Sequence, residues 1–117
     1  MALDSSVLEE LSLTIGRDSA CRLVRLFTNE TRRHFVRLEE ALSSGSADDH
    51  QRLVHKLRGG GIQLGTDELA DLCNLIETDL RQTRRRLHQE ELERLRLSVD
   101  RTIRVLEHWL ADASRGA

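Results

Sequence analysis

The chain has 117 residues, a length typical of one domain, so we expect residues 1–117 to form a single unit with its core at about 4–112. Hydrophobic residues make up 38% and charged residues 32% of the chain, and there is no proline, a balance typical of an all-α protein with strongly charged helix faces. The formal net charge of −2 is too small to indicate nucleic acid or an anionic membrane as a partner.

Nothing in the sequence resembles a membrane span or a signal peptide. No apolar run approaches the ~20 residues that cross a bilayer, and the N-terminal MALDSSVLEEL carries acids where a signal peptide carries bases. We therefore expect a cytoplasmic domain without direct membrane contact, either free or tethered to a larger membrane-anchored protein. Cys21 and Cys73 lack the close spacing of a metal or redox motif, and we expect both to be buried and reduced.

Glycines and short polar clusters divide the chain into five predicted helices. The first is short, at about 4–13, with Asp4 or Ser5 as its N-cap, and the second runs over about 18–42. Apolar residues of the second helix recur at spacings of three, four or their sums, which indicates one buried stripe: Val24, Phe27, Phe35, Leu38 and Leu42.

Capping residues mark the start of the next two helices. Ser46 with Asp49 has the spacing of a capping box, and the third helix runs from there towards Leu64, with Gly65 as its C′ residue. Thr66 caps the fourth helix. The apolar face of this helix comprises Leu69, Leu72, Cys73, Ile76 and Leu80.

The fifth helix is predicted at about 88–111, and residues 113–117 are expected to fray. Trp109 lies beside its apolar stripe, which comprises Leu92, Leu95, Val99, Ile103, Leu106 and Leu110. Short loops between long amphipathic helices favour an antiparallel four-helix bundle, with the short additional N-terminal helix capping one end.

Three consecutive glycines, Gly59 to Gly61, interrupt the third helix. Each glycine lowers helix stability by about 1 kcal/mol relative to alanine in a helix interior, so the run lowers it by roughly 2 to 3 kcal/mol. A helical wheel places Leu53, Leu57 and Leu64 in the core sector, with Val54 and Gly61 at its margin, and His55 nearly opposite. We therefore expect His55 to be exposed, with Gly59 leaving a shallow notch through which another protein approaches the imidazole. Gly60 and Gly61 are expected to ease contact with neighbouring helices.

This arrangement suits phosphoryl transfer. An exposed, neutral imidazole has one ring nitrogen with a free lone pair and can act as a nucleophile. Lys56, Arg58 and Arg52 can favour an incoming dianionic phosphoryl group. Because such transfer depends on positioning and charge, we expect no cofactor or metal on this domain, and Mg²⁺ on the partner.

Residues 55–65, His-Lys-Leu-Arg-Gly-Gly-Gly-Ile-Gln-Leu-Gly, closely resemble the signature His-x-Leu-Lys-Gly-small-small-x-x-Leu-Gly of histidine phosphotransfer (HPt) domains. Residues 27–42 and 69–77 are similar to the flanking helices of that family, so the resemblance covers roughly 23–80. Arg58 replaces the more usual lysine, which keeps the charge and changes its geometry. Gly60 and Gly61 replace serine or alanine.

The resemblance implies that His55 accepts a phosphoryl group from a receiver-domain aspartate and passes it to another response regulator. It assigns a basic supporting role to Arg58 and Lys56, a steric opening to Gly59, and an orienting hydrogen bond to Gln63. We expect the partners, receiver domains and a hybrid sensor kinase, to dock on a patch that includes Gly59, Gln51, Arg52 and Ile62, and the domain itself to be a monomer. Without a nucleotide-binding motif, no autophosphorylation from ATP is expected.

Two other functions are weighed against phosphotransfer. The first is a non-catalytic helical adaptor that docks a receiver or kinase without accepting phosphate. The second is the dimerisation domain of a histidine kinase, against which the glycine run and the missing ATP-binding domain argue.

The remaining polar residues are expected to be solvated or to have structural roles. His34, His50, His88 and His108 are expected to be solvated, and the spacing of His50 and His55 does not favour a zinc site with a cysteine. The run Arg84–Arg86 is read as a solvated helix junction, because no aromatic residues interleave with it. Asp48 and Asp49 are read as helix-start electrostatics, and Trp109 as a bundle anchor with its indole N–H near the surface.

Overall fold

The computed structural model describes residues 5–59 and 67–115, which form five helices and, within those ranges, no strand. The helices are α1 (Ser5–Ile15), α2 (Arg17–Ala41), α3 (Ala47–Gly59), α4 (Asp67–Thr83) and α5 (Gln89–Arg115). Each predicted helix is therefore present. The all-α fold class is confirmed.

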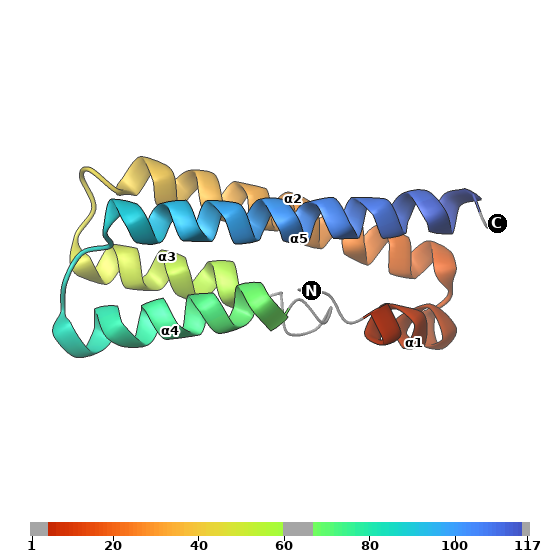
Figure 1. Ribbon diagram of the computed structural model, residues 1–117. Helices are drawn as coiled ribbons and strands as arrows, with labels where there is room; N and C mark the ends of the chain where they lie inside the picture. The colour runs from red at the N-terminus through yellow and green to blue at the C-terminus, as the bar shows by residue number, and fades with distance from the viewer. Residues whose placement is uncertain (1–4, 60–66, 116–117) are drawn as a thin grey trace.

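The four long helices form a bundle in which α2 neighbours α3 and α5, and α4 neighbours α3 and α5. The long helices α2 and α5 extend well beyond α3 and α4, and α1 lies against this extension, at the opposite end from the α2–α3 and α4–α5 connections (Figure 1). The result is an elongated molecule of 47 × 22 × 21 Å. The prediction of a short N-terminal helix at one end of a four-helix bundle is confirmed.

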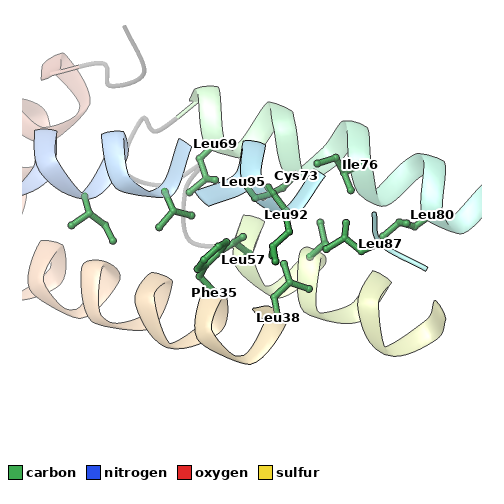
Figure 2. Packing of buried hydrophobic residues seen from close by; sticks show 13 residues of the cluster. Phe35, Leu38, Leu57, Leu69, Cys73, Ile76, Leu80, Leu87, Leu92 and Leu95 are labelled. Atoms are coloured by element: carbon green, nitrogen blue, oxygen red, sulfur yellow. The ribbon is translucent and has the colours of Figure 1, made fainter. Parts of the chain in front are cut away.

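The core has two clusters, one in the four-helix bundle and one where α1 packs against the extension of α2 and α5. The smaller one joins α1 to the extension through Leu8, Val24, Phe27 and Leu106, and Trp109 and Leu110 pack against it partly buried. The larger one fills the bundle (Figure 2) and contains Phe35, Leu38, Val54, Leu57, Leu69, Cys73, Ile76, Leu80, Leu87, Leu92, Leu95, Val99 and Ile103. Nearly every residue assigned to an apolar stripe is in one of these clusters, and Leu42, Leu53 and Leu72 lie at the rim.

The start of α3 agrees with the sequence. Ser46 and Asp49 form a reciprocal capping box: each backbone N–H donates to the side chain of the other, at 3.1 Å. The backbone N–H of Ser46, followed by Arg52, lowers the pKa of Asp49. The expected fraying of residues 113–117 is wrong for 113–115, because α5 continues to Arg115. The predicted caps Asp4, Gly65 and Thr66 lie outside the described residues.

His50 is not solvated, contrary to the sequence-based expectation. Its side chain is fully buried, with an exposed fraction of 0%. Nε2 lies 2.7 Å from the carbonyl oxygen of Ala41, and the backbone N–H of Leu87 donates to Nδ1 at 2.9 Å. The imidazole therefore links the end of α2 to the segment before α5, and it does so with one donor and one acceptor nitrogen.

Gly45 makes room for this link. A Cβ atom at Gly45 would stand 2.9 Å from the carbonyl oxygen of Ala41 and 3.0 Å from the His50 ring, closer than packed atoms normally approach. The loop between α2 and α3 can therefore close over His50 only because residue 45 has no side chain.

The remaining histidines and the cysteines mostly follow expectation. His88 and His108 are exposed, but His34 is half-buried on α2, where burial lowers the pKa of its imidazole, so the prediction for His34 is wrong. Both cysteines are buried and unpaired, as predicted. Burial raises the pKa of the Cys73 thiol to about 12, which keeps it protonated and unreactive near neutral pH.

The arginine run lies at the junction between α4 and α5, as predicted, with Arg84 and Arg86 exposed, and it also makes structural contacts. Arg84 adopts a φ of 52°. Arg85 donates to both oxygens of Glu91 at 2.9 and 2.8 Å and also pairs with Asp79, and Arg86 donates to the carbonyl oxygen of Leu42 at 2.8 Å. The hydrogen bond from Arg85 lowers the pKa of Glu91.

Candidate functional site

His55 projects from the outer face of α3. Val54 and Leu57 beside it are buried at 0% and 1% exposure, whereas the His55 side chain is 55% exposed. The helical phase that buries these two side chains is the phase that turns the imidazole outward. The predicted orientation of His55 is confirmed.

The imidazole is held from the neighbouring helix by Glu77, a residue that the sequence-based interpretation missed. His55 Nδ1 lies 3.0 Å from Oε2 and 3.1 Å from Oε1 of Glu77. Glu77 comes from α4, and its side chain is only 8% exposed. A mostly buried carboxylate therefore faces one specific nitrogen of an exposed ring.

This contact determines which ring nitrogen is free. A carboxylate can only accept, so Nδ1 must carry the proton, and the lone pair of the neutral ring then resides on Nε2. A guanidinium nitrogen of Arg58 also lies 3.3 Å from Nδ1, but a donor cannot bond to a nitrogen that is itself donating. We assign the proton to the bond with Glu77, because it is shorter and its acceptor is charged.

Two arginines flank the Glu77 carboxylate, one at each oxygen. Arg58 Nε lies 3.9 Å from Oε1, and Arg81 Nη1 lies 3.8 Å from Oε2. Arg58 is 28% exposed and also donates to Asn74 Oδ1 at 3.2 Å, so it is anchored to α4 at two points. These positive charges partly offset the negative charge of a carboxylate that is largely withdrawn from water.

The surface around His55 is a shallow depression between α3 and α4, lined by Asp48, Gln51, Arg52, His55, Lys56 and Glu77. Lys56 is exposed, and Arg52 pairs with Asp49 at 2.8 Å. These contacts place four of the predicted site residues, Gln51, Arg52, His55 and Lys56, around one opening.

Gly59 lies one turn after His55 and is exposed. Apart from the backbone of its own helix turn and its chain neighbours, no atom of the described residues comes within 4 Å of the position that a Cβ atom would take there. The packing of the described chain thus gives no reason for glycine at this position, as expected if the free space serves an approaching partner. Gln63 and Ile62, also predicted for the site, and Gly60 and Gly61 lie outside the described residues.

A signal for Glu77 was present in the sequence. Glu77 follows Cys73 by four residues and precedes Leu80 by three, which places a charged residue at the edge of the apolar stripe of α4. A carboxylate at such a position needs a polar partner on the neighbouring helix. The stripe alone does not say that the partner is His55.

No described helix is long and apolar enough to cross a membrane. Within 5–59 and 67–115, no group of three or more His, Cys, Asp or Glu side chains is arranged to hold a metal ion.

Comparison with known proteins gave two matches. The model of the Hpt domain family matches residues 22–105. The crystal structure of histidine-containing phosphotransfer protein B (HptB) from Pseudomonas aeruginosa PAO1 is similar over 95% of this chain and 96% of that chain, with a TM-score of 0.83 and 21% sequence identity. At this identity the structural match shows a shared fold. No curated protein sequence matches the chain.

Proposed function

The chain belongs to the Hpt domain family and acts as a phosphorelay intermediate, and we propose that His55 is the residue that carries its phosphoryl group. The observation that supports this assignment is the pairing of an exposed imidazole with a buried carboxylate at Nδ1. Among the five histidines, His55 alone is exposed and within hydrogen-bond distance of a mostly buried carboxylate: Asp112 beside His108 is itself 53% exposed, and Glu91 lies 3.9 Å from His88.

Transfer to the domain begins at Nε2 of His55. Its lone pair attacks the phosphorus of a receiver-domain aspartyl phosphate, the Nε2–P bond forms, and the P–O bond to the aspartate breaks to release a carboxylate. The proton remains on Nδ1 throughout. The ring therefore becomes a phosphorylated imidazolium, and its new positive charge faces the Glu77 carboxylate at 3.0 Å.

Transfer from the domain is the reverse reaction. The carboxylate of a second receiver attacks the phosphorus, the Nε2–P bond breaks, and the neutral imidazole with its proton on Nδ1 is restored. Because the proton never moves, one geometry serves both directions. The domain needs no general base of its own for either step.

The cations beside the ring support the phosphoryl group. Lys56 is exposed next to His55, and Arg58 lies within 3.3 Å of the ring and is anchored by Asn74. Their charges favour the dianionic group as it is transferred. The resemblance adds an orienting hydrogen bond from Gln63.

We propose receiver domains and a hybrid sensor kinase as the partners, with Mg²⁺ held by the receiver. The proposed docking patch comprises Gln51, Arg52, Gly59 and Ile62, of which Gln51 and Arg52 line the depression at His55. The domain acts in the cytoplasm as a monomer and binds neither nucleic acid nor a membrane.

Phosphotransfer assays separate this function from a docking adaptor. The protein is mixed with purified receiver domains that have been phosphorylated with acetyl phosphate and Mg²⁺. We expect at least one receiver to lose its phosphoryl group while the protein gains phosphate that is labile in acid and stable in base. An adaptor would bind a phosphorylated receiver and leave its phosphate in place.

Filling the space at Gly59 should slow transfer. Gly59→Gln favours the helix, since glycine is a poor helix former, but it places a long side chain over the approach to His55. We expect the transfer rate to fall about tenfold or more, while thermal stability is kept or rises slightly. Stopped transfer reactions and thermal unfolding measure the two effects. The control is Ala111→Gln, which adds a similar side chain at an exposed position on α5. Wild-type transfer by Gly59→Gln would refute the role of this space.

Removing the charge of Glu77 should make phosphorylated His55 less stable relative to the phosphorylated receiver. In Glu77→Gln the amide oxygen can still accept from Nδ1, but the imidazolium formed on phosphorylation loses its anionic partner. Hydrogen bonds to charged groups exceed neutral ones by ~1 to 1.5 kcal/mol, so we expect the transfer equilibrium to move about tenfold towards the phosphorylated receiver. Glu10→Gln, an exposed change on α1, is the control. An equilibrium equal to that of the wild type would show that the carboxylate charge plays no part.

A further inference from the structure

Arg81 and His55 both lie near the same oxygen atom of Glu77, Oε2. Nδ1 of His55 lies 3.0 Å from Oε2 and 3.1 Å from Oε1, and Nη1 of Arg81 lies 3.8 Å from Oε2. Arg81 follows Glu77 by four residues on α4, so the helix itself keeps the two side chains adjacent. At 3.8 Å the guanidinium is too far to form a hydrogen bond, and its interaction with the carboxylate is one of charge.

Arg81 differs from Arg58, the other cation at this carboxylate. Arg58 faces Oε1, is anchored by Asn74 and is 28% exposed. Arg81 is 58% exposed and borders a second shallow depression, which shares Asp48 and Gln51 with the depression at His55. Replacing Arg81 should therefore leave the packing of the bundle intact.

We propose that Arg81 is a positioning residue that acts through Glu77 to set how readily phosphorylated His55 gives up its phosphoryl group. This inference rests on the proposed function of His55. The positive charge of Arg81 offsets part of the negative charge that Glu77 presents to Nδ1. Since that negative charge stabilises the phosphorylated imidazolium, Arg81 limits its stability and favours onward transfer to a receiver.

The sign of the effect follows from the geometry. Loss of Arg81 leaves Glu77 more negative at Nδ1, which stabilises phosphorylated His55. The transfer equilibrium then moves towards the phosphorylated domain, in the direction opposite to Glu77→Gln. Arg81 is more than half exposed and screened by solvent, so the shift should be about two- to fivefold.

The test measures this equilibrium with one receiver that exchanges phosphate with the wild type. The receiver is phosphorylated with acetyl phosphate, and the ratio of phosphorylated domain to phosphorylated receiver is measured for the wild type, Arg81→Gln, Arg81→Lys, Glu77→Gln and the double variant Arg81→Gln/Glu77→Gln. Arg94→Gln, which removes an exposed charge from α5, is the matched control. Thermal unfolding of each variant confirms that the bundle is folded.

We expect a two- to fivefold shift towards the phosphorylated domain in Arg81→Gln, a value near wild type in Arg81→Lys and Arg94→Gln, and no further effect of Arg81→Gln when Glu77 is already glutamine. An unchanged equilibrium in Arg81→Gln would overturn the proposal. So would a shift towards the receiver, or an effect that persists without the Glu77 charge, because either would mean that Arg81 contacts the phosphoryl group directly. Failure of the wild type to accept phosphate from any receiver would instead refute the proposed function.

Discussion

Replacing His55 by glutamine should abolish phosphotransfer while the protein stays folded and still binds its receivers. Glutamine keeps a polar, planar end group but has no ring nitrogen with a nucleophilic lone pair. Because His55 is 55% exposed, its loss removes little packing. We expect transfer to the protein to fall about a thousandfold or more, measured as acid-labile phosphate after mixing with phosphorylated receivers.

His108→Gln is the matched control for this experiment. His108 is another exposed histidine on a long helix, and its nearest acidic partner is Asp112, at 3.3 Å. We expect this variant to accept phosphate at the wild-type rate. Substantial phosphate on the His55→Gln protein would place the acceptor on another residue.

The largest effect on stability is expected at His50. His50→Ala removes a fully buried ring and leaves the N–H of Leu87 without its partner, whereas the carbonyl oxygen of Ala41 still accepts from the backbone N–H of Gly45 at 2.7 Å. A buried cavity and one orphaned donor together should lower the free energy of unfolding by about 3 kcal/mol. Urea denaturation measures this change as a lower midpoint at an unchanged slope.

An exposed histidine again provides the comparison. His108→Ala should change the free energy of unfolding by no more than about 0.5 kcal/mol, as is usual for surface substitutions. If His50→Ala were equally mild, the hydrogen bonds of the His50 ring would not hold α2 to the start of α5 as inferred.

The two histidines of α3 show what a helical wheel can predict. The wheel that turns His55 outward also places His50 in the sector of Val54 and Leu57, since five residues advance the helix by ~140°. The expectation that His50 is solvated was based on its being a histidine. Its position on the helical wheel indicated burial, and the structure shows that His50 is buried. Gly45, which the ring requires, was visible in the sequence only as part of a loop.

The helices and their stripes could be predicted because local signals specify them. Ser46 and Asp49 cap α3 by contacts only three residues apart, and the spacing of leucines in α5 reflects its own periodicity. Such patterns need no knowledge of which helices meet.

The features that could not be predicted depend on contacts between residues that are distant in the sequence. Glu77 is separated from His55 by 22 residues, so its role follows only once α3 and α4 are placed side by side. Likewise, Arg86 reaches Leu42 across 44 residues, and nothing in the arginine run identifies that acceptor. The exposed position of His55 was predictable, whereas its contact with the Glu77 carboxylate was not.

The central claim is that the phosphoryl group is carried on Nε2 of His55 with the proton retained on Nδ1. Phosphorus and nitrogen NMR of the ¹⁵N-histidine-labelled protein, phosphorylated by a receiver domain, tests it directly. We predict a single phosphohistidine, with the phosphorus coupled to Nε2 of His55 and a proton on Nδ1. A phosphorus coupled to Nδ1, or to any residue other than His55, would contradict the mechanism.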